Sequence, residues 1–447
     1  DRFNWRGQSD SIERNKNTVT NMNQIHNNAL PPSLWAQTAE PASDFPPLRA
    51  TADTEVVVIG GGFTGLSAAL HLGLAGHSAI VLESHEPGWG ASGRNGGQVN
   101  PAWKILPDEI IARFGKARGE RIVDMASRTC DLVFDLIDEH SIQCDAVRPG
   151  YVQGANDANG VKAVQDWQRQ WQARGIETNC LDRRQTAELL GTNFYQGAMI
   201  DARGGNVQPF SYARGLARAA AHNGATIHGG SAVIGIEKDG HGWLVRTHGA
   251  RVKCKKILIG TNGYTGKAWP GLQKTVVPLP SFIMATQPLS DNLRRSVLPG
   301  LHAVSETRRI GVYYRMDRDG RFVIGGRGNV FNVEPMGNGD HVQREAQRIF
   351  PALGDIPWDF HWGGYVAMTR EHTPKLMQLA PGVLAGMGYN GRGIAMATMM
   401  GKQLALGAFD DDPDMEITPL SPIAFHNFRQ LGISYKILSG QWLDRFR

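Results

Sequence analysis

The sequence predicts an α/β protein of two domains. Because a Rossmann-like domain is combined with a domain built on an antiparallel sheet, the whole chain is of the α+β two-domain type. Three observations support this. Residues 55–83 read as strand, glycine-rich turn, helix and strand, the unit of a Rossmann-like domain. Residues 276–289 and 313–328 alternate apolar and polar side chains, as in an antiparallel sheet. The length, 447 residues, exceeds what one simple core accommodates.

The first unit carries the features of a dinucleotide site. A β-branched run, 56–59, is typical of a buried parallel strand, and Gly60, Gly62 and Gly65 follow it with G-x-G-x-x-G spacing. Such glycines allow a tight turn, close approach of a pyrophosphate and close packing of the next helix. Glu83 ends the second strand, where an acidic side chain can bind the ribose hydroxyls and would repel a 2′-phosphate.

A second glycine-rich loop favours FAD over NAD. Residues 88–97 contain five glycines, where a plain NAD domain would continue into another amphipathic helix. A flexible loop rich in donors suits the ribityl chain and ring of a flavin, although an exposed mobile loop would have the same composition.

Near the other end, residues 382–404 read as a strand, a glycine-rich turn and a helix. The N-terminus of that helix presents free N–H groups and the positive end of its dipole, which would stabilise negative charge on a reduced flavin. An ordinary strand–helix pair is the alternative.

Together these motifs resemble the D-amino-acid oxidase superfamily of FAD enzymes, which includes the glycine and sarcosine oxidases. The matching segments are GGGFTGLSAALHL, GASGRNGGQ, DARGGNVQP, ILIGTNGYT and MGYNGRGIA. SGRNGGQ, YYR followed by GRFVIGGR, and WGGY are most similar to the gamma-glutamylputrescine oxidoreductase branch. The resemblance implies a Rossmann-like FAD-binding domain and a substrate domain whose antiparallel sheet lies over the flavin.

The resemblance and the motifs assign a set of cofactor-binding residues in five segments. They are Gly60, Gly62, Phe63, Thr64, Gly65, Glu83, Ser84, Gly90, Ala91, Ser92, Arg94, Asn95, Gly96, Gly97, Gln98, Val233, Thr261, Asn262, Gly263, Gly388, Tyr389, Asn390, Gly391, Arg392, Gly393 and Ile394. In sarcosine oxidases a cysteine of the C-terminal half holds the flavin covalently. No cysteine follows Cys254, so we expect non-covalent FAD.

The catalytic residues remain unassigned, and the substrate-site candidates are Gln98, Tyr314, Arg315, Arg327, Tyr365 and Met368. In glycine and D-amino-acid oxidases an arginine before the last glycine-rich loop binds the substrate carboxylate. The matching position in GGYVAMTREHTP is Met368, which favours an amine over an α-amino acid. Arg315, Arg327 or Arg392 could still bind a distal carboxylate. Trp362 and His361 are expected to plug the domain interface more than to line the cavity.

The strand over the flavin bears on the electron acceptor. Sarcosine oxidases place a lysine there that promotes reaction with O₂, whereas this chain has Val323. We therefore expect either O₂ or another acceptor, such as a quinone or a partner protein.

Composition excludes several classes of function. The net charge of +5 is spread over the chain without a basic run, so nucleic-acid binding is not expected. No apolar run is long enough to span a membrane. The four cysteines, Cys130, Cys144, Cys180 and Cys254, form no metal-binding spacing and suggest free thiols in a reducing compartment. We expect no metal, and a cytoplasmic protein, either free or peripheral to the inner face of the membrane.

The expected domains are discontinuous. Residues 1–50 form an N-terminal arm and lead-in, with 1–28 loosely held. The FAD-binding domain comprises 51–145, 200–265 and 366–410, the substrate domain 146–199 and 266–365, and 411–447 form a tail. Further helices are expected at 107–141, 160–174, 184–190, 210–223 and 342–350. Further strands are expected at 147–153, 226–236, 255–260 and 361–368, with a hairpin of 234–237 and 243–246.

The predicted function is oxidation of a C–N bond in a primary or secondary amine, such as a γ-glutamylated diamine. Hydride passes from the carbon to flavin N5, and the imine hydrolyses to an aldehyde. One alternative is an oxidase or dehydrogenase of a small N-substituted or cyclic amino acid, which an arginine-lined cavity would favour. Another is a flavin-bearing subunit without turnover.

Overall fold

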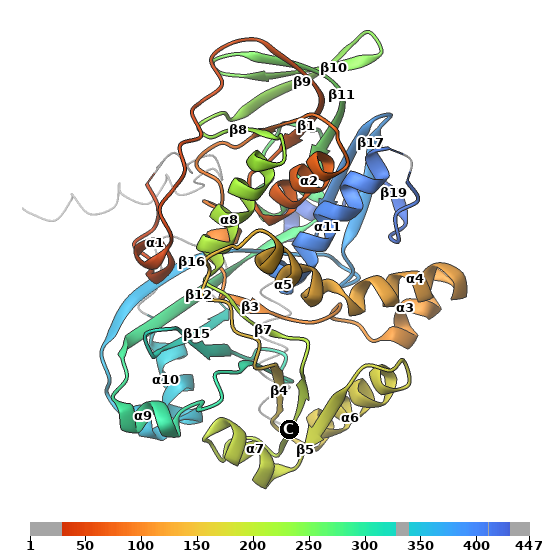
Figure 1. The fold of residues 1–447 in the computed structure, drawn as a ribbon. Helices are drawn as coiled ribbons and strands as arrows, with labels where there is room; N and C mark the ends of the chain where they lie inside the picture. The colour runs from red at the N-terminus through yellow and green to blue at the C-terminus, as the bar shows by residue number, and fades with distance from the viewer. Residues whose placement is uncertain (1–28, 328–338, 410, 430–447) are drawn as a thin grey trace, which may run out of the picture.

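The computed structural model describes residues 29–327, 339–409 and 411–429. The arm predicted for 1–28 and the end of the predicted tail, 430–447, lie outside the described residues. Two sheets organise the described chain, one above the other in the view of Figure 1.

The first sheet has nine strands, in the order β19-β17-β18-β11-β1-β2-β8, with a hairpin of β9 and β10 attached to β11. The strands are β1 (Ala52–Ile59), β2 (Ala79–Leu82), β8 (Thr226–His228), β9 (Val233–Asp239), β10 (Gly242–Thr247), β11 (Arg251–Ile259), β17 (Lys375–Ala380), β18 (Val383–Met387) and β19 (Ile417–Pro419). β1 pairs in parallel with β2 and β11, and β11 in parallel with β18. The carboxyl ends of these strands therefore share one edge, where open α/β sheets bind ligands.

Helices cover one face of this sheet, and the β9–β10 hairpin contributes to the core on the other. The helices are α2 (Phe63–Leu74), α5 (Thr129–Glu139), α8 (Pro209–His222) and α11 (Gly393–Ala408), with α3 (Pro107–Phe114) and α4 (Lys116–Ser127) beside them (Figure 1). Val56 and Val58 belong to the helix-side core, whereas Val57 and Ile59 belong to the core that includes Val245 of the hairpin. The continuous β-branched run of β1 is thus explained by burial on both faces.

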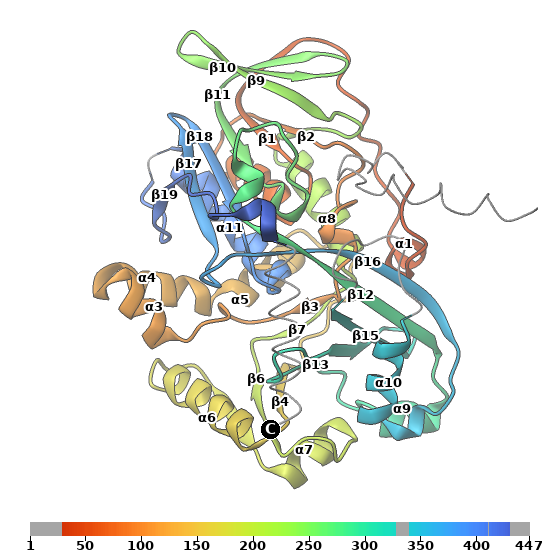
Figure 2. The same ribbon diagram turned by 180° about the vertical axis from the view of Figure 1, so that it is seen from behind.

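The second sheet has eight strands, in the order β16-β12-β15-β14-β13-β4-β6-β5, and only its β13–β4 pair is parallel. The strands are β4 (Tyr151–Ala155), β5 (Thr178–Leu181), β6 (Gly197–Asp201), β12 (Val277–Pro288), β13 (Ala303–Glu306), β14 (Tyr313–Met316), β15 (Arg321–Arg327) and β16 (Trp358–Met368). The helices α6 (Ala158–Gln172), α7 (Arg183–Leu190), α9 (Asp291–Ser296) and α10 (Asp340–Ile349) accompany it. The long strands β12 and β16 run toward the first sheet (Figure 2).

Two short elements complete the fold, and one predicted strand needs correction. A small sheet pairs β3 (Gln98–Val99) with β7 (Gly205–Asn206), and α1 (Leu34–Thr38) lies in the lead-in. The single strand predicted at 226–236 is two strands, β8 and β9, because the chain turns at Gly230, whose φ is +56°. Residues 417–419, within the predicted tail, form the edge strand β19.

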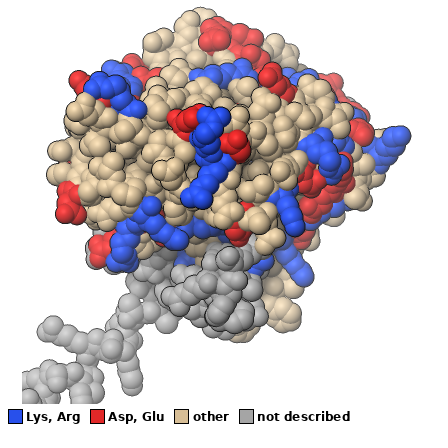
Figure 3. Space-filling model, turned by 90° about the horizontal axis from the view of Figure 1, so that it is seen from below, with Lys and Arg blue, Asp and Glu red and all other residues tan. Residues whose placement is uncertain are grey.

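The charged surface is mixed. On the face seen in Figure 3, lysine and arginine side chains alternate with aspartate and glutamate over the part that the structure describes. No helix within 29–327, 339–409 or 411–429 is long and apolar enough to cross a membrane.

Candidate functional site: a dinucleotide cradle that opens onto the second sheet

The first glycine-rich turn joins β1 to α2 with almost no spare room. Gly60 has a φ of +103°, and a Cβ on Gly65 would lie 1.9 Å from the Gly60 carbonyl oxygen. Only glycine allows the helix to approach its strand this closely. The backbone N–H of Phe63, in the first turn of α2, donates to Ser92 Oγ at 2.9 Å, which ties this turn to the second glycine-rich loop.

Hydrogen bonds within the protein hold Glu83 in place. Its Oε2 accepts from the Gly61 N–H at 2.6 Å, and its Oε1 accepts from the His85 N–H at 2.9 Å and from Ser84 Oγ at 3.0 Å. Burial by itself would raise the pKa of this carboxyl, but the hydrogen bonds from His85, Gly61 and Ser84 outweigh it and leave the pKa below its usual value. The side chain is thus an ionised, oriented acceptor at the end of β2.

Two tryptophans that are distant in sequence hold the second glycine-rich loop. Trp35 of α1 donates from Nε1 to the Asn95 carbonyl at 2.7 Å, and Trp362 of β16 donates to the Arg94 carbonyl at 3.0 Å. Their rings meet edge to face, with centroids 5.7 Å apart. The loop is therefore clamped between the lead-in and the second sheet. Trp362 plugs this interface, as expected, but the role of Trp35 had no local signal in the sequence.

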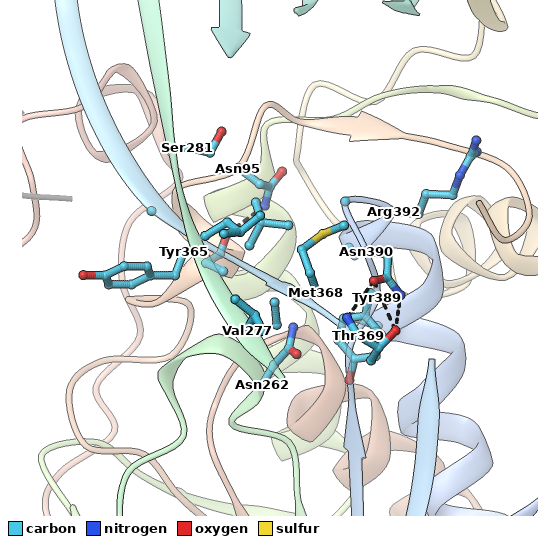
Figure 4. Close-up of a pocket in the computed structure, with 18 of the residues that line it drawn as sticks. Asn95, Asn262, Val277, Ser281, Tyr365, Met368, Thr369, Tyr389, Asn390 and Arg392 are labelled. Atoms are coloured by element: carbon cyan, nitrogen blue, oxygen red, sulfur yellow. Dashed lines mark hydrogen bonds between the residues drawn. The ribbon is translucent and has the colours of Figure 1, made fainter. Parts of the chain in front are cut away.

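The last glycine-rich turn, between β18 and α11, closes the cradle. Asn262, after β11, accepts from the Gly388 N–H at 2.9 Å, and Asn390 accepts from the Thr369 N–H at 2.9 Å (Figure 4). A Cβ on Gly391 or Gly393 would meet nothing within 4 Å. The N-terminus of α11 therefore faces open space, with its free N–H groups and positive dipole end directed at it.

These segments surround one cavity of about 1780 Å³, which extends to the second sheet. Ligand sites for single small molecules are usually roughly 300–1,000 Å³, so this cavity has room for a dinucleotide and a substrate. Most of the predicted cofactor residues line it. They are Gly60, Gly62, Phe63, Thr64, Glu83, Ser84, Gly90, Ala91, Ser92, Arg94, Asn95, Gly96, Gln98, Val233, Thr261, Asn262, Tyr389, Asn390, Gly391, Arg392, Gly393 and Ile394. Gly65, Gly97, Gly263 and Gly388 lie behind this lining.

Four of the six substrate-site candidates line the cavity, namely Gln98, Arg327, Tyr365 and Met368. Gln98 donates from Nε2 to the carbonyls of Val304 and Tyr314, both at 2.9 Å, and so joins the second loop to the second sheet. Met368 is the last residue of β16 and extends toward the space between the labelled residues in Figure 4.

The other two candidates, Tyr314 and Arg315, lie outside the cavity lining. Side chains alternate along a strand, so Tyr314 of β14 points away into the core and donates its hydroxyl to Tyr195 Oη at 3.0 Å. Its neighbour Tyr313 faces the cavity instead. Arg315 shares the face of Tyr313 but is covered, because its Nη1 donates to the carbonyls of Gly97 and Val207. Burial lowers its pKa to about 10.

The cavity lining carries far more basic than acidic residues. The basic ones are Arg94, Lys104, Lys267, Arg308, Arg309, Arg327, Arg370, Arg392 and Arg429, and the acidic ones are Glu83 and Glu306. Both carboxylate oxygens of Glu306 already accept hydrogen bonds within the protein. Tyr195 Oη donates to its Oε1 at 2.8 Å, and Arg308 Nε donates to its Oε2 at 2.8 Å. The lining therefore suits anionic ligands.

The cysteines of the described part of the chain lie away from the cavity lining. None of the cavity-lining residues within it is a cysteine, and burial raises the pKa of Cys130, Cys144 and Cys254 to about 12. No cluster of three or more potential metal ligands occurs among the described residues.

With this geometry in view, residues 55–406 match the family model of FAD dependent oxidoreductases named DAO. The chain belongs to this family. It is 32% identical over 368 residues to the probable oxidoreductase OrdL of Rhizobium meliloti (strain 1021), covering 81% of this chain and 85% of that protein. It is 30% identical over 379 residues to the gamma-glutamylputrescine oxidoreductase of Escherichia coli (strain K12), covering 83% and 88%.

Solved structures support the fold of this FAD-dependent oxidoreductase. Glycine oxidase from Geobacillus kaustophilus superposes with a TM-score of 0.70 at 19% identity, covering 83% of this chain and 99% of that one. L-proline dehydrogenase from P. horikoshii gives 0.66 at 20% identity, covering 81% and 98%. The predicted family and the predicted two-sheet fold are thus confirmed.

The cradle fits the FAD that the family requires. Glu83 presents fixed acceptor oxygens at the end of β2, where a dinucleotide places its ribose. The glycines of α11 leave space at a helix N-terminus, where negative charge is stabilised.

Proposed function

We propose that this FAD-dependent oxidoreductase oxidises a C–N bond of a primary or secondary amine, of the γ-glutamylputrescine type, to an imine that hydrolyses to an aldehyde. The residues proposed to hold FAD without a covalent link are the cavity-lining members of the predicted set, together with the glycines behind them. When bound, FAD supplies the chemistry by accepting a hydride from the carbon next to nitrogen.

The observation that carries the amine assignment is Met368 at the cavity. In the glycine and D-amino-acid oxidases that the sequence resembles, the matching residue is an arginine that binds the substrate carboxylate. A methionine there offers an apolar, adaptable contact to a methylene chain and no charge. The likeness to the gamma-glutamylputrescine oxidoreductase of Escherichia coli supports the same substrate class.

One observation favours the alternative, an enzyme for small N-substituted or cyclic amino acids. The basic lining of the cavity suits a carboxylate. Part of that charge serves the pyrophosphate of FAD, and a γ-glutamylated diamine carries a carboxylate as well, so the basic lining is compatible with both substrate classes.

In this proposal the residues of the chain bind the cofactor and the substrate, and none of them has to act as a strong base. Gln98 and Trp362 fix the second loop to the second sheet, and Trp35 fixes it to the lead-in. Val323, which stands where the resemblance puts the lysine of sarcosine oxidases, is buried in the core. The acceptor of the electrons is O₂, a quinone or a partner protein.

The test is anaerobic reduction of the flavin by candidate substrates. The purified yellow protein is mixed anaerobically with γ-glutamylputrescine, putrescine, sarcosine, pipecolate or glycine, and the flavin absorbance is followed. Bleaching by the first compound supports the proposal, whereas bleaching by amino acids alone supports the alternative. If no amine bleaches the flavin, the remaining alternative is a flavin-bearing subunit without turnover. Admitting air then separates an oxidase from a dehydrogenase by the rate at which the colour returns.

The free thiols support the proposed location. The four cysteines are free in the structure, which supports a reducing compartment such as the cytoplasm.

A further inference from the structure

Arg327, the last residue of β15, has no side-chain partner among the residues that the structure describes. It lines the cavity and is half-buried, and its Nε and Nη1 are buried with no hydrogen-bond acceptor in that part of the chain. No carboxylate within the described part of the chain forms an ion pair with it. Leaving buried donors of a charged group unpaired is costly, so a ligand that supplies the acceptors would be bound there.

Other arginines of the lining differ in this respect. Arg308 pairs with Glu306 and with Glu345, the latter at 2.7 Å. Arg94 donates to the Trp89 carbonyl at 2.9 Å and lies over that indole ring. Arg392 donates to the Pro101 carbonyl and lies over the rings of Tyr151 and Trp167. Arg327 alone among these four retains its planar fork of donors for a ligand.

The position of Arg327 separates it from the site where an α-carboxylate would be bound. On β12, Ser281 pairs with Arg327 and Val277 pairs with Met368. Ser281 and Val277 are four residues apart on β12, which is about 13 Å along the strand at roughly 3.3 Å per residue. The carboxylate of a γ-glutamylated diamine lies nine bonds from the carbon to be oxidised, on the order of 11 Å when extended.

We propose that Arg327 binds a carboxylate of the substrate that is remote from the oxidised carbon, so that the substrate is an acylated amine with an anionic far end. This inference rests on the proposed function. It makes the basic lining compatible with Met368, because the carboxylate is recognised at the end of β15 instead of the end of β16.

The experiment compares two amines that share their reactive end. γ-Glutamylputrescine and N-acetylputrescine are both acylated diamines, but only the first carries a carboxylate. The FAD-loaded full chain is assayed as wild type, Arg327→Gln, Arg327→Lys and Arg251→Gln. Arg251 is an exposed strand-end arginine far from the cavity lining and serves as the matched control.

Arg327→Gln is expected to lower kcat/KM for γ-glutamylputrescine by about 10- to 100-fold, the effect of losing a charge-assisted pair. N-acetylputrescine should change by less than about threefold, and Arg251→Gln should resemble wild type. Arg327→Lys should be intermediate, because the charge remains but the fork is lost. Equal losses for both compounds, or an unchanged ratio between them, would overturn the inference while leaving amine oxidation in place.

A binding measurement covers the case in which neither compound is oxidised. Calorimetric titration of the same holoproteins with glutarate and with its uncharged diamide isolates recognition of the carboxylate. Glutarate binding that weakens at least about 10-fold in Arg327→Gln supports the carboxylate site even if the proposed reaction fails. Equal binding by both proteins, or none by wild type, contradicts it.

Discussion

The hydroxyls of Thr64 and Tyr389 lie 2.6 Å apart, although 325 residues separate them in the chain. Thr64 belongs to α2 after the first glycine-rich turn, and Tyr389 belongs to the last such turn. Tyr389 Oη also donates to the Gly386 carbonyl at 3.1 Å. This buried contact joins two walls of the cradle, and burial raises the pKa of the Tyr389 phenol. Contacts within the protein therefore hold these two walls of the cradle together.

Tyr389→Phe removes this link and leaves Thr64 without that partner. We expect the unfolding free energy to fall by about 1–2 kcal/mol, the cost of a buried hydrogen bond, and FAD to dissociate faster. Urea unfolding and flavin release measure the two effects. Tyr365→Phe is the control for the unfolding measurement, with an expected change below about 0.5 kcal/mol for a partly exposed phenol. Equal behaviour of the two variants would show that the contact does not matter.

Gly393→Ala tests the helix N-terminus as a cofactor site. The added methyl meets no protein atom within 4 Å, so the FAD-free protein should unfold as before or gain up to about 1 kcal/mol. The methyl occupies the space that the helix end faces, so FAD affinity should fall at least about 10-fold.

Gly65→Ala provides the contrast to Gly393→Ala. Its methyl collides with the Gly60 carbonyl, and the FAD-free protein itself should be destabilised. Thermal unfolding with and without FAD distinguishes the cases. An unchanged FAD affinity in Gly393→Ala would show that the cofactor does not approach α11.

Glu83→Gln should reveal the ionised carboxylate through pH. The folded-state pKa lies below the usual 4.5, so the carboxylate stabilises the fold fully above about pH 4.5. That contribution is lost as the pH falls through the folded pKa. The difference in unfolding free energy between wild type and Glu83→Gln should therefore be largest above pH 5 and shrink below pH 4.5. A difference that is constant, or that grows in acid, would be inconsistent with hydrogen bonds to the ionised form.

Met368→Arg should move selectivity toward amino acids. An arginine at the end of β16 restores the residue type that binds the carboxylate in the amino-acid oxidases, and one charge-assisted pair is worth roughly tenfold in binding. We expect glycine or sarcosine to bind at least about tenfold more tightly, measured by perturbation of the flavin spectrum. Met368→Gln, similar in length but uncharged, is the control. If both variants bind these amino acids equally, position 368 does not face the reacting carbon.

Local spacing accounts for what the sequence predicted well. The turn between β1 and α2, the acid after β2 and the glycines before α11 are each defined by neighbours within about 25 residues, and the cavity has them in its lining or just behind it. Met368 and Arg327 were placed at the cavity by resemblance of short strand motifs, which are local as well.

Tertiary packing accounts for what the sequence could not predict. The motif YYR does not say which tyrosine faces the cavity, because a shift of one residue reverses the face of every side chain on β14. The pairing of β14 with β15 determines that Tyr313 faces the cavity. Tyr313 lies against Gly325 of β15, and its hydroxyl lies 3.1 Å from Ser281 Oγ. The clamp of Trp35 on Asn95 spans 60 residues and depends on where the lead-in packs.

The most direct test of the central claim is anaerobic titration of the FAD-loaded protein with γ-glutamylputrescine, followed at the flavin band near about 450 nm. The account predicts complete bleaching at a stoichiometric amount of this amine, with glycine and sarcosine ineffective at the same concentration. A flavin that is bleached by the amino acids and not by the amine, or a protein that releases no FAD on denaturation, would contradict it.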